Sequence, residues 1–202
     1  MVILTVCDRG LEMGWKWKQE IRLQYDTEAD GYDELYSQEQ NEKYDLAIDH
    51  INPFSATERI LDSGCGTGIF LDRVASNVEY AVGIDFSSKA LQKARVRLNR
   101  LTNVYLVCAD FDYLPFALST FTHIFMFTAL PAPAHWDVGL GQALRALTDT
   151  GTVVLSVPKA EISNEMLLAK LKGNKLEPRA LIDQENTPDY VFIGERAHRL
   201  GG

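Results

Sequence analysis

The sequence predicts an α/β fold built on a mostly parallel sheet with helices on both faces. Three observations predict it. From Glu58 onward, short apolar runs alternate with amphipathic helical segments. Most of these apolar runs are continuous rather than alternating, as is typical of strands buried on both faces. The first run leads directly into a glycine cluster that opens a helix. Such alternation requires crossover connections, which are expected to be right-handed.

The composition predicts one soluble globular domain spanning residues 1–202. Hydrophobic residues make up 46% of the chain and charged residues 24%, both ordinary values for such a domain. No apolar run approaches the roughly 20 residues needed to cross a bilayer. The net charge of −8 argues against binding nucleic acid through the overall field. The three cysteines lack metal-ligand spacing, so we expect no metal site and a reducing, cytoplasmic location.

An N-terminal helical cap is predicted over residues 13–52. Apolar and aromatic side chains recur at helical spacing in three segments, Trp15 to Tyr25, Thr27 to Tyr36 and Gln38 to Ile51. Asn52-Pro53 ends the last of these segments. Residues 1–12 show no such pattern, and we expect them to be a frayed extension, with Met13 as an alternative start.

The core, residues 58–158, is expected to alternate strands with helices. The predicted strands are 59–61, 80–84, 104–109, 121–127 and 152–157. The predicted helices are 69–77, 87–100, 136–147 and, beyond the core, 161–171. Two further strands, 176–182 and 190–193, form a predicted terminal hairpin within residues 176–195.

The glycine cluster Asp62-Ser63-Gly64-Cys65-Gly66-Thr67-Gly68 lies where the first core strand turns into a helix. Glycines there permit positive φ and let a ligand approach the backbone closely. The Gly-x-Gly-x-Gly spacing differs from the Gly-x-Gly-x-x-Gly of dinucleotide binders, the rival nicotinamide dehydrogenases. The preceding Asp62 disfavours a pyrophosphate but suits an ammonium or sulfonium ligand. The alternative is that Asp62 only caps the turn.

Two more acids end the next two predicted strands. Asp85 follows the glycine cluster by about 20 residues, the spacing at which a carboxylate binds ribose hydroxyls. Asp110 can accept a hydrogen bond from an adenine amino group while Phe111 packs on the ring. In the alternative interpretation, Asp85 caps the following helix and Asp110 is an ordinary loop aspartate.

This ordered set resembles the class I S-adenosylmethionine (SAM)-dependent methyltransferases over roughly residues 25–158. The resemblance implies a Rossmann-like sheet with an antiparallel last strand, N-terminal helices and SAM as cofactor. It implies a cofactor site formed by Tyr25, Tyr32, Asp62, Gly64, Cys65, Gly66, Gly68, Asp85, Phe86, Asp110 and Phe111. Cys65 is expected to fill the turn rather than to act as a nucleophile, and the tyrosines to be core aromatics or cofactor ligands.

The methyl acceptor is not specified by any motif. The segment Thr128 to Pro133 lacks the Asn-Pro-Pro-Tyr signature of enzymes that methylate planar amino groups, and it lacks the Pro-Cys pair of C5-pyrimidine enzymes. Candidate catalytic residues are Tyr32, Asp33 and His135. We expect RNA or a protein of the translation machinery as acceptor, with a small molecule or a non-catalytic SAM-binding scaffold as alternatives.

Two surfaces are candidate partner sites. Lys89, Lys93, Arg97 and Arg100 form a basic stripe on one predicted helix, either a solvated face or an RNA contact. The resemblance implies that the strand around Val104–Val107 lies at the sheet edge, where an apolar strand needs a cover. In some small methyltransferases of translation components a zinc-binding activator protein pairs with this edge, so the resemblance allows such a partner here.

Overall fold

The computed structural model describes residues 4–5, 12–130, 136–185 and 187–197. Its strands are β1 (Leu4–Thr5), β2 (Arg59–Ser63), β3 (Tyr80–Asp85), β4 (Val104–Cys108), β5 (Phe121–Phe127), β6 (Leu147–Pro158), β7 (Leu176–Ile182) and β8 (Asp189–Arg196). Its α-helices are α1 (Glu12–Glu28), α2 (Tyr32–Asp49), α3 (Ile69–Val74), α4 (Ser88–Arg97), α5 (Trp136–Ala146) and α6 (Asn164–Gly173). Short 3-10 turns η1 (Ala75–Asn77) and η2 (Phe111–Tyr113) complete the described elements.

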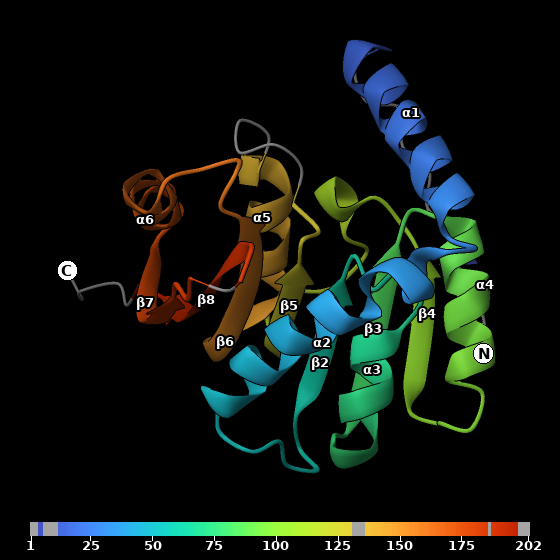
Figure 1. Cartoon of the computed structure of the whole chain (residues 1–202). Helices are drawn as coiled ribbons and strands as arrows, with labels where there is room; N and C mark the ends of the chain where they lie inside the picture. Colours follow the sequence, from blue (N-terminus) through green and yellow to red (C-terminus); the bar gives the residue numbers. More distant parts are fainter. Residues whose placement is uncertain (1–3, 6–11, 131–135, 186, 198–202) are drawn as a thin grey trace.

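A single sheet with the strand order β1-β4-β3-β2-β5-β6-β8-β7 runs through the molecule (Figure 1). The strands from β1 to β6 pair in parallel, whereas β8 pairs antiparallel with both β6 and β7. This arrangement confirms the predicted mixed sheet. The order reverses at β2, which lies between β3 and β5, and ligands of open α/β sheets bind outside the carboxyl ends of strands at such a point.

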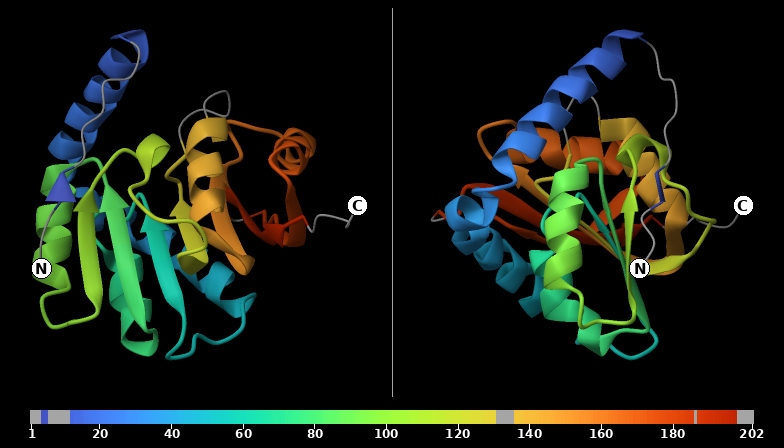
Figure 2. Two further views of the ribbon diagram at one scale, coloured as in Figure 1. Left: turned by 180° about the vertical axis from the view of Figure 1, so that it is seen from behind. Right: turned by 90° about the vertical axis from the view of Figure 1, so that its right-hand side faces the viewer.

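Helices cover both faces of the sheet (Figure 2). Side chains of α2, α3 and α4 pack in one hydrophobic cluster, and those of α5 and α6 pack in another. The buried β5 supplies both, with Phe125 and Phe127 in the first and Ile124 and Met126 in the second. Alternate residues of a strand point to opposite faces, so a continuous apolar run fits a sheet covered twice.

The N-terminal region differs from the prediction. Two helices, α1 and α2, replace the three predicted segments, and the break falls at residues 29–31. No glycine or proline interrupts the chain at Ser37, so the helix that begins at Tyr32 continues through it. Helix α1 begins at Glu12, and its axis leads away from the sheet above the carboxyl ends of β3 and β4 (Figures 1 and 2).

The prediction that Val104–Val107 forms the sheet edge is wrong at one end of the strand. Leu4 pairs with Val107 and Thr5 with Cys108, so β1 extends the sheet beyond β4. The expectation that residues 1–12 are only a frayed extension is therefore wrong for Leu4 and Thr5. Of the described strands, none pairs with Val104 to Leu106 on the β1 side.

The basic stripe on α4 contacts acids of the same chain. Arg97 pairs with Asp33, and Arg100 Nη1 lies 2.8 Å from Asp72 Oδ1. Lys93 Nζ lies 3.2 Å from Asp30 Oδ1. The stripe therefore joins α4 to α2, to α3 and to the turn between α1 and α2. Its charge is partly neutralised within the chain, which weakens the RNA interpretation.

Candidate functional site

A cavity of about 490 Å³ opens at the carboxyl ends of the parallel strands. Its lining follows the sheet order: Asp110 after β4, Asp85 on β3, Gly66 after β2, Thr128 after β5 and Pro158 on β6. Residues of α1 and α2 close it from above. The cavity therefore crosses the reversal point of the sheet, where the sequence predicts a cofactor.

The glycine loop forms one wall of this cavity. Gly64, Gly66 and Gly68 have φ values of 83°, 51° and 81°, in the left-handed region where side chains are strained. A Cβ atom at Gly64 would lie 2.4 Å from Ala129 Cβ, whereas one at Gly66 would meet no atom within 4 Å. Because Gly66 lines the cavity, its missing side chain leaves the backbone open to a ligand.

Asp85 is fixed beside this loop. Its carboxylate accepts hydrogen bonds from the backbone N–H of Gly66, at 2.9 Å, and of Ser87, at 2.8 Å. Burial raises its pKa to about 6, and the two backbone donors oppose that rise. The side chain lines the cavity and keeps unused lone pairs, because each oxygen accepts one of these bonds. Asp85 thus has the placement required of a group that accepts from ligand hydroxyls.

Asp110 and Phe111 also line the cavity, and a residue absent from the sequence prediction contacts both. Lys18 Nζ on α1 lies 2.5 Å from Asp110 Oδ2 and 5.6 Å from the centre of the Phe111 ring. The other Asp110 oxygen accepts from the backbone N–H of Asp112 at 3.0 Å. Asp110 therefore anchors α1 over the cavity in this structure.

Asp62, Cys65 and Gly68 do not line this cavity, although each was predicted to contact the cofactor. Gly68 precedes α3, and a Cβ there would lie 2.9 Å from Leu98 Cδ1, so its role is close packing against the α4 region. Burial raises the pKa of the Cys65 thiol well above its usual range, in agreement with a filling role. Asp62 is 2% exposed behind the glycine loop.

The titration of Asp62 predicts a pH dependence of stability. Burial, with a contribution from Asp85, raises the pKa of Asp62 from 3.8 to about 8. Between these values the folded state holds a proton that the unfolded state releases, so the free energy of unfolding falls as the pH rises. Asp85, with its pKa of about 6, is half titrated at pH 6 and contributes to the slope in both proteins. The Asp62→Asn change should therefore remove only the Asp62 part of the slope, up to about 1.4 kcal/mol per pH unit.

Urea unfolding between pH 6 and pH 8 measures this slope. Asp149→Asn is the matched control, because the Asp149 side chain is 92% exposed. Equal slopes for the parent and Asp62→Asn proteins would contradict a raised pKa at Asp62.

The remaining predicted site residues separate into three groups. Tyr25, Tyr32 and Phe86 line the cavity, with the Tyr25 and Phe86 ring centres 5.8 Å apart. Asp33 lies outside the lining, where it accepts from Thr67 Oγ1 at 2.5 Å and pairs with Arg97. Its placement disfavours the predicted catalytic role, because both oxygens hold structural contacts. His135 lies outside the described residues.

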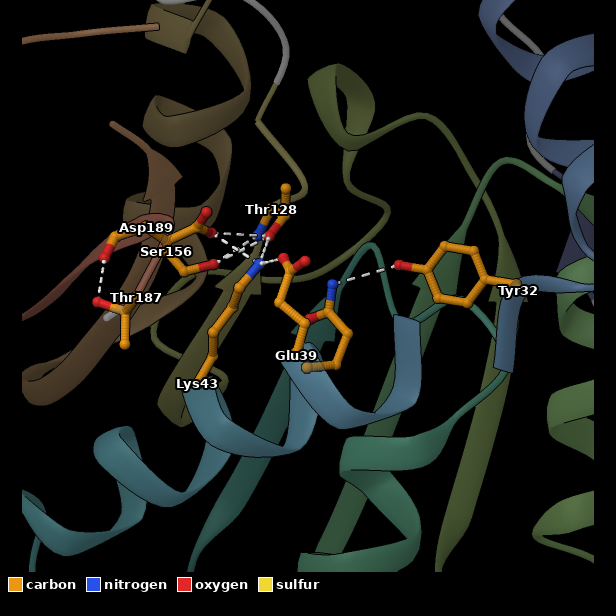
Figure 3. A network of polar contacts seen from close by, with 8 residues as sticks. Tyr32, Glu39, Lys43, Thr128, Ser156, Thr187 and Asp189 are labelled. Atoms are coloured by element: carbon orange, nitrogen blue, oxygen red, sulfur yellow. Dashed lines mark hydrogen bonds and ion pairs between the residues drawn. The ribbon is translucent and has the colours of Figure 1, made fainter. Parts of the chain in front are cut away.

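A polar network that was not predicted from the sequence joins α2 to the ends of β5 and β6 and the start of β8 (Figure 3). Lys43 on α2 is 1% exposed, and its Nζ lies 2.7 Å from Glu39 Oε1 and 2.9 Å from Asp189 Oδ2. It also donates to Thr128 Oγ1 at 2.9 Å. Only the helical i, i+4 spacing of Glu39 and Lys43 is visible in the sequence, since Thr128 and Asp189 are distant along the chain.

Thr128 connects this network to the cavity. Its φ of 48° is unusual for a β-branched residue. The backbone N–H donates to Ser156 Oγ at 2.8 Å, and the hydroxyl donates to Asp189 Oδ2 at 3.1 Å. These bonds to β6 and to the start of β8 hold the strained residue in place, and Thr128 lines the cavity.

The described ranges lack two classes of feature. Of their helices, none combines the length and the apolar character that a bilayer crossing requires. In the same part of the chain, no group of three or more His, Cys, Asp or Glu side chains could hold a metal ion.

The glycine loop and the sheet around it match a known family. Residues 60–151 match the family model described as "Methyltransferase domain". The malonyl-[acyl-carrier protein] O-methyltransferase of Erwinia pyrifoliae is 31% identical over 146 residues, which cover 72% of this chain and 52% of the relative. The demethylmenaquinone methyltransferase of Corynebacterium urealyticum is 26% identical over 172 residues, or 82% of this chain and 67% of the relative. The chain thus spans about half the length of the first relative.

Solved structures share the fold at low sequence identity. A putative methyltransferase from Haloferax volcanii, solved in complex with the Trm112 methyltransferase activator, superposes with a TM-score of 0.68 at 17% identity. That match covers 86% of this chain and 98% of the other. Geranyl diphosphate C-methyltransferase from Streptomyces coelicolor, solved with S-adenosyl-L-homocysteine, superposes with a TM-score of 0.66 at 14% identity and covers 78% of this chain and 79% of the other.

Proposed function

The chain belongs to the class I SAM-dependent methyltransferases, and from this premise we propose that it transfers a methyl group from SAM to a small-molecule acceptor. The observation that carries the proposal is the cavity, because it joins the glycine loop and Asp85 to a second compartment over β5 and β6. A cofactor and an acceptor can therefore meet inside one cavity.

The residues present fit SAM. Gly66 offers open backbone to the methionine part, and Asp85 offers a carboxylate to the ribose hydroxyls. Phe86 and Phe111 supply aromatic surface for the adenine at the β3–β4 end of the cavity. We also propose that Asp110 accepts a hydrogen bond from the adenine amino group. The Asp110 carboxylate would then be shared between the adenine and Lys18.

SAM supplies a methyl group already activated on a sulfonium, so the protein needs mainly to align the acceptor and to exclude water. Helices α1 and α2 line the cavity on the side away from the sheet and reduce its exposure to solvent. Thr128, held by Lys43 and Asp189, fixes the wall between the cofactor side and the acceptor side. Tyr32 lines the same cavity and stays a candidate catalytic residue, whereas Asp33 is a positioning residue.

A small molecule replaces RNA or a protein of the translation machinery as the proposed acceptor. The basic stripe expected to contact RNA is paired within the chain at Lys93, Arg97 and Arg100. Relatives named for malonyl-[acyl-carrier protein] and for demethylmenaquinone support an acceptor of metabolic type. A non-catalytic SAM-binding scaffold is the alternative.

An activator partner is a second, independent part of the proposal. The Haloferax volcanii neighbour was solved with its Trm112 activator, and Val104 to Leu106 offer a free strand edge in the described structure. A small zinc-binding protein that pairs there would compete with β1 for Val107 and Cys108. Truncation of residues 1–5 should therefore strengthen its binding, and unchanged binding would place the partner elsewhere.

Transfer of labelled methyl from SAM tests the function. The purified protein is incubated with malonyl-acyl carrier protein, with demethylmenaquinone and with a cell extract separated into RNA, protein and small molecules. We expect label in one small-molecule fraction and none with Asp85→Ala. Label confined to RNA would contradict the small acceptor, and SAM binding by calorimetry without any transfer would favour the scaffold.

A further inference from the structure

The part of the cavity beyond the glycine loop has a chemistry of its own. We call it the acceptor compartment, and it is formed by Tyr32, Tyr36, Glu39, Gln40, Leu130 and Glu161. The strand order places it over β5 and β6, next to the cofactor residues on β2 and β3. The Tyr32 and Tyr36 rings lie 5.0 Å apart and give it an aromatic side.

Gln40 is the first sign of a ligand in this compartment. Its side chain is 5% exposed, and its Oε1 atom has no hydrogen-bond partner. The other half of the amide makes one long bond, at 3.4 Å, to the Tyr32 hydroxyl. In either orientation of the amide, one polar end is buried without a partner, which is unfavourable unless a ligand supplies one.

The charged side chains of the compartment determine which charge a ligand can carry there. Glu39 Oε1 is held by Lys43, which leaves its second oxygen available to the cavity, and Glu161 adds another carboxylate. Burial raises the pKa of Tyr32, and Tyr25, Asp85 and Glu39 raise it further. Burial likewise raises the pKa of Tyr25, with Asp85, Glu28 and Glu161 adding to it. The pKa values of both tyrosine hydroxyls are therefore raised by the negative charge of carboxylates on both sides of the compartment.

No free cation balances these acids within the described lining. The basic residues that line the cavity are Lys18 and Arg22, both on α1. Lys18 pairs with Asp110 and Asp112 at the adenine end, and Arg22 Nε lies 3.9 Å from Asp26 Oδ2. Lys43 is outside the lining and is held between Glu39 and Asp189 (Figure 3). Among the protein groups of this lining, none would compensate the charge of an acceptor carboxylate, which would meet the like charge of Glu39 and Glu161.

We propose that the methyl acceptor presents a hydroxyl or N–H group to Glu39 and Gln40 and carries no carboxylate at its reacting end. The proposal rests on the proposed function, because it names the acceptor class of the same site. Glu39 is the specificity-determining residue, since it accepts from the donor group, and Lys43 is the positioning residue that orients it.

Fragment binding tests the proposal in the full-length protein. Calorimetry first establishes binding of S-adenosylhomocysteine, and failure at this step would sink the proposed function. The saturated complex is then titrated with catechol, benzylamine and malonate by ligand-observed NMR. We expect catechol or benzylamine to bind and malonate not to bind. The two binding fragments distinguish a hydroxyl from an amine acceptor. Malonate binding, or binding of no fragment, would overturn the proposal while leaving the cofactor result intact.

Two variants locate the contact. Glu39→Gln and Gln40→Leu should each raise the dissociation constant of the bound fragment, by roughly tenfold or more for the charged Glu39. S-adenosylhomocysteine affinity should hold in Glu39→Gln. Glu42→Gln, an exposed change on the same helix and outside the lining, is the control. Melting curves verify folding, and unchanged fragment affinity in both folded variants would refute the assignment.

Discussion

Replacing Asp85 with alanine should raise the dissociation constant for SAM by at least roughly 100-fold, the combined effect of two charge-assisted hydrogen bonds. The carboxylate is placed at the end of β3 and lines the cavity. Its hydrogen bonds from Gly66 and Ser87 fix its position, so little conformational freedom is lost when a ribose binds. Isothermal calorimetry measures the change.

The same two hydrogen bonds complicate the alanine variant, because the Gly66 N–H and Ser87 N–H lose a partner. Asp85→Asn keeps an oxygen for one of them and should show intermediate affinity. Asp49→Ala, at the exposed end of α2, serves as the control for a lost carboxylate. Parent-like affinity in a folded Asp85→Ala protein would exclude a ribose contact. A protein that fails to fold would show it by circular dichroism, and Asp85→Asn then carries the test.

Replacing Lys43 with methionine should lower the free energy of unfolding by about 3–5 kcal/mol, the usual effect of removing one partner of a buried ion pair. The Asp189 side chain is only 3% exposed and would lose its buried cationic partner. Thr128 Oγ1 would lose a donor at the same time. Urea unfolding measures the change, and the midpoint should fall without a change in slope.

A double-mutant cycle separates the ion pair from simple packing. Lys43→Met with Asp189→Leu removes both charges, so the double variant should regain a large part of the stability lost by Lys43→Met. Lys170→Met is the matched control, because the Lys170 pair with Asp137 is at the surface and should contribute less than about 1 kcal/mol. Equal losses for Lys43→Met and Lys170→Met would contradict a structural role for the network.

The variant also probes function, because the Lys43 network holds a cavity residue in a strained conformation. Loss of the donor should let Thr128 relax from its φ of 48° and move the wall between the two compartments. We expect methyl transfer to fall while SAM affinity changes less, since Gly66 and Asp85 do not contact Lys43. An equal loss of methyl transfer and of SAM affinity would indicate general unfolding.

Much of the fold followed from local patterns. Continuous apolar runs such as Phe121 to Phe127 indicated strands covered on both faces, and Gly64 and Gly66 indicated a turn open to a ligand. The N-terminal prediction failed in detail because helical spacing alone does not show where one helix ends. The break at residues 29–31 lacks a proline but contains Asp30-Gly31, a local turn signal that marks the end of α1.

By itself the sequence determined the family and predicted where the methyl donor binds. Asp85 and the glycine loop lie at fixed spacings along successive strands, and the rules of parallel sheets bring strand ends together. The tertiary structure decided the rest. It paired Asp33 and the basic stripe with each other rather than with ligands, and it buried Lys43 between Glu39 and Asp189.

The physical reason lies in the range of the interactions. A strand end or a glycine turn is set by a few neighbouring residues, so its chemistry is readable in sequence order. An ion pair between residues 146 positions apart, such as Lys43 and Asp189, depends on how α2 lies against β8, and no local pattern encodes it. The acceptor compartment is built from such contacts, and for this reason only the folded chain indicates which acceptor it takes.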